Sequence, residues 1–264
     1  KPQTPNPKPQ TPNPSVYLLL KAISRMGNVC DRCNREVDGG KYASLTPEDI
    51  VKIRAHRREQ NEERAESGEL PPTSSIRDGK TSYSIPRLGS YSGKVKNFKA
   101  SGYGEWEGAD GSAYRGEWED DKPNGQGKEV LSDGSTYEGG FRNGLREGRG
   151  LKVWKGGNSY EGDWSAGEMH GNGEYKWANG DIYRGQWIRG KREGRGTFLW
   201  ANGNVYTGQF RGDKVEGLGE LKIRDGITFR GEFKDGLQDG PGEVIVPGEE
   251  ATPFRGIWKQ GQLI

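Results

Sequence analysis

The sequence predicts an all-β repeat array in which short antiparallel hairpins stack one after another. Three features predict it: an aromatic-x-Gly-x-aromatic box that returns at a constant interval, a Gly-x-Gly that follows each box at a fixed distance, and a dipeptide such as Asp-Gly or Asn-Gly near the end of each unit. A fixed period of about 23 residues is typical of repeat architectures. The regular boxes begin at Tyr114, Tyr137, Tyr160, Tyr183, Tyr206 and Phe229.

Two further copies flank the regular ones. A weaker copy begins at Tyr91 and has Val95 in place of the second aromatic residue, and Phe254 to Trp258 closes the series after a short insertion. Eight units therefore cover residues 91–264. The glycine between the two aromatic residues lies on their face of the strand, where the absence of Cβ leaves room for a neighbouring ring to lie close.

Each unit should contain two strands. In one unit we expect a strand over Tyr183–Trp187, a loop over Arg189–Gly194 and a second strand over Arg195–Trp200. Asn202-Gly203 would then form a two-residue type I′ turn, because Asn-Gly tolerates the positive φ angles of that turn.

This pattern resembles the MORN repeat (membrane occupation and recognition nexus), whose Tyr-x-Gly-x-Trp, Gly-x-Gly and Asp-Gly features recur from Tyr91 to about Trp258. The resemblance implies an elongated, twisted, single-layer sheet of stacked hairpins without catalytic machinery or a cofactor. It also implies scaffolding, membrane association or dimerisation. Protein partners of the cytoskeleton or membrane skeleton are expected, in the cytoplasm, at the cytoplasmic face of a membrane or in a cilium.

Composition fits a repeat array better than a compact globule. Only 30% of the 264 residues are hydrophobic and the mean hydropathy is −1.00, but in an array each hairpin buries its aromatic residues against the next. The net charge is +2 and the pI is about 8.4, which argues against a nucleic-acid-binding protein. The sequence contains no apolar run long enough to cross a bilayer, so membrane contact would be peripheral.

Residues 1–25 are of low complexity and rich in proline, with the same short sequence twice in 1–14. The chain begins with Lys1 and its first methionine is Met26, so this segment is not necessarily part of the native protein. Such proline spacing favours an extended, unpacked chain.

Residues 26–45 contain an acylation-like signal. Translation from Met26 would expose Gly27 for myristoylation, and Cys30 and Cys33 would be available for palmitoylation as a second anchor. Asp31 departs from the usual pattern, which has Ser or Thr there. The alternatives are that Gly27 is an ordinary linker residue, or that the two cysteines form half of a zinc site whose other ligands the sequence does not supply. Two cysteines this close cannot provide a disulfide framework, which favours a reduced, intracellular protein.

A charged helix is expected over residues 46–67, because Thr46 is a good N-cap and Pro47 suits the first helical position. It could be a solvated helix or a partner-binding stub. Residues 68–90 form a linker into the array, in which 82–85 add a short edge strand.

Two sets of array residues are candidate binding sites. Trp154, Trp177 and Trp200 share one register and predict a groove for a partner, although such aromatic residues also serve packing. The second set consists of basic residues that would meet phosphoinositide head groups, or else lie in solvated loops together with Glu147 and Glu193. This set is Arg142, Arg146 and Arg149 in one unit and Arg189, Lys191, Arg192 and Arg195 two units later.

No catalytic or metal site is predicted, since no nucleophile has a base beside it. The sequence therefore favours a non-catalytic scaffold that links a membrane surface to cytoskeletal partners. The alternatives are a lipid-independent axonemal scaffold, or a regulatory fragment of a phosphatidylinositol phosphate kinase. The sheet edge at Leu263-Ile264 also predicts pairing with a second copy.

Overall fold

The computed structural model describes residues 80–85, 89–97, 99–248 and 253–264, and these residues form 17 strands. They belong to two compact units: an N-terminal unit of residues up to 192 together with 198–201, and a C-terminal unit of residues 193–197 and 202–264. The predicted helix over 46–67 and the acylation residues Gly27, Cys30 and Cys33 lie outside the described residues.

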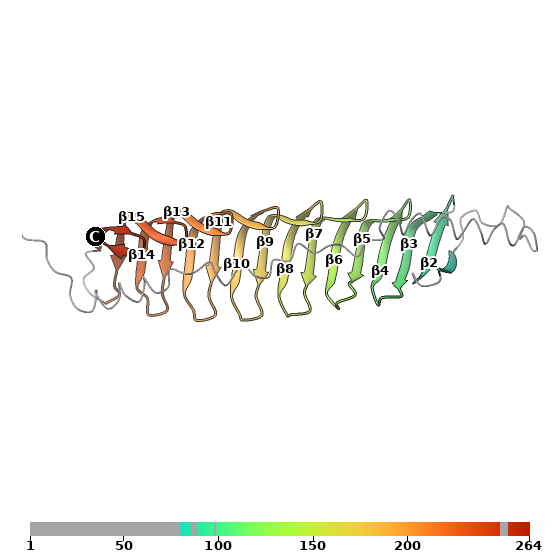
Figure 1. The fold of residues 1–264 in the computed structure, drawn as a ribbon, viewed down its shortest axis with the longest axis horizontal. Helices are drawn as coiled ribbons and strands as arrows, with labels where there is room; N and C mark the ends of the chain where they lie inside the picture. The colour runs from blue at the N-terminus through green and yellow to red at the C-terminus, as the bar shows by residue number, and fades with distance from the viewer. Residues whose placement is uncertain (1–79, 86–88, 98, 249–252) are drawn as a thin grey trace, which may run out of the picture. The chain divides into compact units, whose positions relative to one another are not determined.

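The strands follow the chain order of the repeats (Figure 1), and β11 (Lys191–Leu199) has residues in both units. The N-terminal unit contains β1 (Lys80–Ile85), β2 (Gly89–Lys96), β3 (Lys99–Gly108), β4 (Ala113–Glu119), β5 (Lys122–Val130), β6 (Thr136–Arg142), β7 (Leu145–Val153), β8 (Ser159–Ser165), β9 (Glu168–Lys176) and β10 (Ile182–Ile188). The C-terminal unit contains β12 (Val205–Arg211), β13 (Lys214–Lys222), β14 (Thr228–Lys234), β15 (Leu237–Ile245), β16 (Phe254–Lys259) and β17 (Gln262–Leu263).

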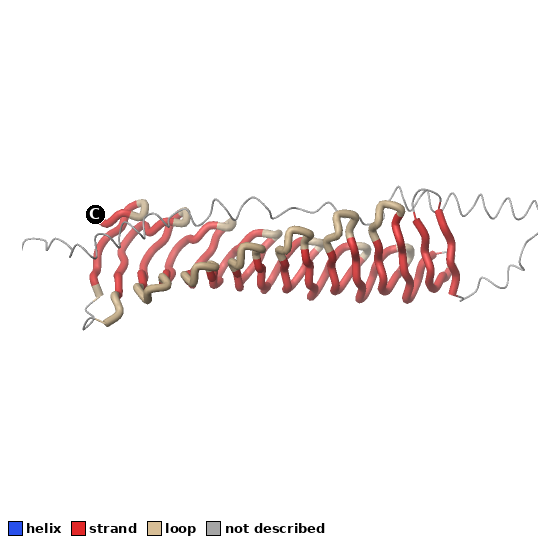
Figure 2. The backbone as a smooth tube through the Cα atoms, turned by 90° about the horizontal axis from the view of Figure 1, so that it is seen from below, coloured by secondary structure: helices blue, strands red, loops and turns tan. Residues whose placement is uncertain are grey.

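Each strand pairs antiparallel with the next one along the chain, from β1 to β10 in the N-terminal unit and from β12 to β17 in the C-terminal unit. Short loops join the strands (Figure 2). The predicted array of consecutive hairpins is therefore confirmed. The edge strand expected over 82–85 is β1, which begins at Lys80.

The loop predicted over Arg189–Gly194 is wrong. β10 ends at Ile188 and β11 begins at Lys191, so only Arg189 and Gly190 connect them, with φ angles of 50° and 75°. Positive φ at both central residues is the signature of a type I′ turn. The Gly190 N–H donates to the carbonyl of Met169 at 2.9 Å in the preceding hairpin, so a neighbouring repeat stabilises a turn whose first residue is not Asn or Asp.

The type I′ turn predicted at the Asp-Gly and Asn-Gly dipeptides is wrong as well. Residues 131–135 separate β5 from β6, and at Asp133-Gly134 only Gly134 has a positive φ, of 88°. The Leu131 N–H donates to the Ser135 carbonyl at 2.8 Å, and the Asp133 carboxylate accepts from the Ser135 N–H at 2.7 Å. A hydrogen bond of this kind favours the turn over residues 131–135 over the shorter type I′ turn. The reason is that the aspartate side chain takes the place of a backbone hydrogen-bond acceptor.

The boxes build a packing of aromatic rings on one face of the strands in each unit, here called the tyrosine face. In five boxes the second aromatic residue packs edge-on against the first aromatic residue of its own box and against that of the preceding box. These second residues are Trp118, Phe141, Trp164, Trp187 and Phe233. Trp118, for example, lies 5.0 Å from Tyr114 and 5.4 Å from Tyr91 between ring centroids, with interplanar angles of 88° and 87°. Edge-to-face contact is the favoured geometry for such rings, so the pattern that defines the repeat also forms its core.

A pair of facing glycines lies under the ring of Tyr91, Tyr114, Tyr137, Tyr160 and Tyr206. Gly139 and Gly150 are opposite each other on β6 and β7, and a Cβ on Gly150 would lie 2.5 Å from Cζ of Tyr137. The glycines therefore leave the space for a ring that the sequence predicts. The ring that fills this space belongs to the tyrosine of the same box. The Tyr137 hydroxyl donates to the Gly140 carbonyl at 3.0 Å, and burial raises the pKa of this phenol.

The opposite face carries ion pairs between strands. Arg115 bonds Glu105 at 3.1 Å, and equivalent pairs recur at the same register in later repeats. These side chains are largely exposed, so each pair contributes little to stability. The recurring pairs are Lys128–Glu138, Arg184–Glu174, Arg230–Glu220 and Arg255–Glu243.

A candidate partner-binding stripe

The three predicted tryptophans lie at equivalent places, each just after the end of a strand. Trp154 follows β7, Trp177 follows β9 and Trp200 follows β11, and all three belong to the N-terminal unit. Each begins a turn between two strands, and the backbone N–H of Trp154 donates to the Asn158 carbonyl at 2.9 Å. The three side chains are half-buried, so part of each indole is accessible. We call them the tryptophan stripe.

Two buried rings connect the tryptophan stripe. Tyr175 lies 5.4 Å from Trp154 and 4.4 Å from Trp177 between ring centroids. Phe198 lies 5.3 Å from Trp177 and 4.7 Å from Trp200. Tyr175 and Phe198 are both fully buried, so the indoles rest on a buried aromatic base. The row is thus pre-formed, which reduces the entropy cost of binding a partner.

Cationic side chains lie beside the tryptophan stripe. Lys152 Nζ is 4.6 Å from the Trp154 ring centroid, and Arg192 Cζ is 5.9 Å from that of Trp177 and 5.6 Å from that of Phe198. Both residues are buried on the tyrosine face. Cation–π contact stabilises a charge in such a place.

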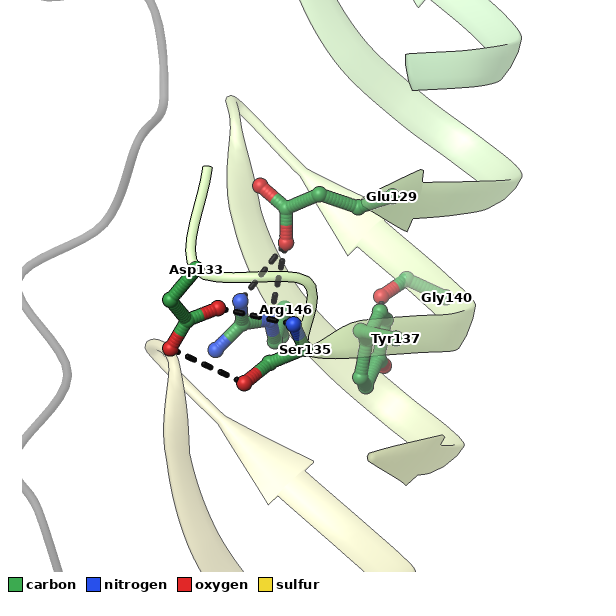
Figure 3. A network of polar contacts seen from close by, with 6 residues as sticks. All are labelled: Glu129, Asp133, Ser135, Tyr137, Gly140 and Arg146. Atoms are coloured by element: carbon green, nitrogen blue, oxygen red, sulfur yellow. Dashed lines mark hydrogen bonds and ion pairs between the residues drawn. The ribbon is translucent and has the colours of Figure 1, made fainter. Parts of the chain in front are cut away.

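A buried ion pair lies one repeat before the stripe (Figure 3). The Arg146 guanidinium donates to Glu129 Oε2 at 2.6 Å through Nη2 and at 3.2 Å through Nε, and it lies 5.1 Å from the Tyr137 ring centroid. The two side chains are 3% and 10% exposed. The carboxylate thereby compensates one of the buried cations of this face.

The structure does not bring the predicted basic residues together. Arg146 and Arg192 are buried on the tyrosine face, where a head group has no access. Arg149 is exposed and pairs in register with Asp163 on the opposite face. The exposed Arg142, Arg189 and Lys191 lie at the tight turns, and Arg195, also exposed, belongs to the C-terminal unit.

Comparison with known families agrees with the geometry. The family model described as MORN repeat matches six consecutive segments, 114–136, 137–159, 160–182, 183–205, 206–228 and 229–244. The chain is a MORN-repeat protein. The matched segments begin at the six regular boxes, and the outer copies at Tyr91 and Phe254 form strand pairs of the same kind, β2–β3 and β16–β17.

No curated protein matches this MORN chain in sequence. Among solved structures, it is similar to the TCP domain of SAS-4 (dCPAP) of Drosophila melanogaster, solved with a proline-rich motif of Ana2 (dSTIL), at 12% identity and a TM-score of 0.37, over 72% of this chain and 95% of that one. It is also similar to the TCP10 domain of Danio rerio CPAP, at 8% identity and a TM-score of 0.26, over 70% and 97%.

Side chains also link successive MORN repeats. In five repeats the residue before the Gly-x-Gly accepts a backbone N–H from the tight turn of the next repeat, as Glu147 does from Ala166 at 2.9 Å. Glu147 and Glu193 were expected in solvated loops, but both act as such caps. The other pairs are Asn124 with Asn143, Glu193 with Gly212, Glu216 with Asp235 and Asp239 with Gln260.

Sequence reasoning identified the tryptophans of this MORN array but missed their surroundings. Lys152, Tyr175 and Phe198 occupy one position in successive repeats, and Arg146, Met169 and Arg192 occupy another. The cations share these positions with large apolar residues in other repeats. An alignment of the repeats would therefore have predicted that the cations lie on the tyrosine face. In the part of the chain that the structure covers, no helical segment has the length and apolar character that crossing a bilayer requires.

Proposed function

We propose that the protein is a non-catalytic scaffold that links the cytoplasmic face of a membrane to cytoskeletal or membrane-skeleton proteins. MORN-repeat proteins generally serve as scaffolds for protein interaction and membrane association. The observation that carries the proposal is the half-buried tryptophan stripe on its buried aromatic base. Accessible, pre-organised tryptophans are the side chains most often responsible for binding energy at protein interfaces.

The membrane half of the proposal rests on the sequence around Gly27. A myristoyl group on Gly27 and a palmitoyl group on Cys30 or Cys33 would provide the two anchors that stable membrane attachment requires. The exposed Arg142, Arg189 and Lys191 at the tight turns are available to add attraction to anionic lipids.

The partner half is tested by photo-crosslinking in cells that express the full chain. A photoreactive amino acid replaces Ile188, which is 49% exposed at a tight turn, or Trp200 in the tryptophan stripe. We expect crosslinks to one or a few defined proteins from position 200 and none of these from position 188. Equal crosslinking from both positions would contradict partner binding by the stripe.

The membrane half is tested by mass spectrometry of the N-terminus of the native protein. A myristoyl group on Gly27 is the expected result, and Gly27→Ala should then move the protein from the membrane fraction to the soluble fraction. Intact peptides that span Arg25, Met26 and Gly27 would exclude acylation at Gly27. The lipid-independent axonemal or cytoskeletal scaffold would then be the better description.

A further inference from the structure

The buried cations of the tyrosine face indicate that a second layer covers this face. Arg146, Lys152 and Arg192 are only 2%, 5% and 2% exposed, and all three belong to the N-terminal unit. The described residues of this unit form a single layer of strands that pair edge to edge. Neighbouring repeats pack against the sides of these long side chains, but a single layer places nothing over their charged ends. The apolar face of a sheet is normally buried against another element, so the covering element lies outside the described residues.

The helix predicted over residues 46–67 has the length that such a layer requires. Its 22 residues would span about 33 Å. The tyrosine face of the N-terminal unit runs from Tyr91 on β2 to Tyr183 on β10, which is eight strand intervals or about 38 Å. Residues 68–79 join the predicted helix to Lys80 at the start of β1, and a chain of this length extends over up to about 40 Å. The helix can therefore reach along this face from within its own chain.

The charges of the predicted helix are segregated between two sides. Four glutamates follow the spacing i, i+3, i+4 and i+7, which places them on one side of a helix. Three arginines lie on the opposite side, and a fourth lies between the two sides. The glutamates are Glu59, Glu62, Glu63 and Glu66, the opposite arginines are Arg54, Arg57 and Arg64, and the intermediate one is Arg58.

The charges of the tyrosine face decide which side of the helix turns toward it. Acids on the sheet already interact with two of the cations, since Glu129 pairs with Arg146 at 2.6 Å and Asp133 attracts Lys152. A layer that turned its arginines toward this face would nevertheless bury like charges close together, which is unfavourable in a low dielectric. The glutamate side avoids this repulsion. Burial and length therefore indicate the helix, and charge indicates its orientation.

We propose that residues 46–67 form the second layer of the N-terminal unit. The segment lies as a helix along the tyrosine face of its own chain and turns its glutamate side toward Lys152 and Arg192. This contact closes the face to other proteins unless the helix is displaced. It is independent of partner binding by the tryptophan stripe, so either proposal can fail without the other.

Photo-crosslinking within the purified full chain tests the position of the helix. A photoreactive amino acid replaces Glu62 on the glutamate side, or Arg57 on the opposite side as the matched control. We expect position 62 to crosslink to the tyrosine face of the N-terminal unit at least tenfold more than position 57 does. Equal crosslinking from both positions, or no crosslink from position 62 to this face, would overturn the proposal.

A mixture of unlabelled and isotopically labelled chains shows whether the helix and the face belong to the same chain. The two forms are mixed in equal amounts before crosslinking, and the linked peptides are identified by mass spectrometry. We expect both peptides of each link to carry the same label. Links that join one labelled and one unlabelled peptide in half of all cases would show that a second copy supplies the layer, which would also overturn the proposal.

Amide hydrogen exchange of the full chain provides a second measurement. Replacing the four glutamates by glutamine removes the charges of one side, and replacing Arg54, Arg57 and Arg64 by glutamine is the matched control. Each set of substitutions removes Glu–Arg pairs within the helix. We expect amides of residues 46–67 to exchange at least tenfold faster in the glutamate variant than in the arginine variant, while the strands keep their protection in both. Equal exchange of residues 46–67 in the two variants would contradict contact through the glutamate side.

Discussion

The tyrosine of each box combines two roles in a single side chain. Its ring covers a pair of facing glycines, and its hydroxyl donates to the carbonyl three residues later, at 3.0 Å for Tyr114 and at 3.2 Å for Tyr206. That carbonyl lies where the pairing of the hairpin is interrupted by a bulge. The hydroxyl thus replaces a lost backbone partner, as buried carbonyls require.

Removing one hydroxyl should therefore destabilise the array. Tyr137→Phe leaves the buried Gly140 carbonyl without this donor, and we expect a loss of about 1–2 kcal/mol in the free energy of unfolding. Phe229 lies over Gly231 and Gly242 and lacks the hydroxyl, so Phe229→Tyr is the reverse experiment and should stabilise. Urea unfolding measures both, and equal effects of the same sign would contradict this account.

The buried phenols also predict sensitivity to alkali. Burial is the main cause that raises the pKa of Tyr114, Tyr137, Tyr160 and Tyr206 above that of an exposed tyrosine. The unfolded chain then loses these protons first, so stability is fully present below about pH 10 and falls as the pH rises further, by up to about 1.4 kcal/mol per pH unit for each tyrosine.

Urea unfolding between pH 8 and pH 11 measures this slope. Tyr137→Phe should reduce the slope by the share of one tyrosine, because it removes one titrating group. An unfolding midpoint that stays constant up to pH 11 would be inconsistent with buried, protonated phenols.

At the scale of strands, the facing glycines decide how closely a ring can approach the sheet. A methyl group on Gly150 would overlap the Tyr137 ring, whereas nothing lies within 4 Å of the corresponding position at Gly156. We expect Gly150→Ala to cost about 2–3 kcal/mol through overpacking and Gly156→Ala to be nearly neutral. Thermal unfolding of the two variants compares them, and similar losses in both would show that backbone entropy, and not the ring contact, explains the glycines.

The ion pair between β5 and β7 is a second feature at this scale. Glu129→Ala leaves Arg146 buried without this carboxylate and should cost about 3–5 kcal/mol, whereas the double variant Glu129→Leu with Arg146→Met should be close to the wild type. Lys128→Ala removes an exposed pair with Glu138 and should cost less than about 1 kcal/mol. A double variant as unstable as Glu129→Ala would contradict this explanation.

The turns show why sequence reasoning located the strands better than their connections. Period and alternation identified the boxes, because side-chain direction in a strand depends only on local geometry. Arg189 and Ala166 do not suggest a type I′ turn, yet both have positive φ there. Their turns are held by N–H groups of Gly190 and Gly167 that bond to the preceding hairpin, and a single-unit pattern contains no signal for that bond.

For the whole molecule, stability should depend on nearest-neighbour contacts between repeats. Ring contacts, turn hydrogen bonds and side-chain caps each join one repeat to the next, as Trp118 does with Tyr91 and Glu147 with Ala166. In such an array the free energy of unfolding is approximately a sum over repeats and their interfaces. Removal of a whole repeat should preserve the register of those that remain.

Deletion of residues 206–228, one complete MORN repeat, tests this expectation. We predict a folded β protein with a lower free energy of unfolding and a smaller denaturant dependence, since less surface is exposed on unfolding. A deletion of 206–217, which removes about half a repeat, places glycines opposite rings at the wrong register and should abolish cooperative unfolding. Circular dichroism in urea measures both, and equal stability of the two deletions would contradict the repeat model.

The sequence by itself determined the period, the two strands of each unit, the face that carries the rings and the place of Trp154, Trp177 and Trp200. These follow from local rules of strand geometry and side-chain size that recur in every repeat. Only the tertiary structure decided which turn is tight and which arginines are buried. Both depend on partners in other strands, such as Glu129 for Arg146 and the Met169 carbonyl for Gly190, and their burial follows from packing against neighbouring repeats.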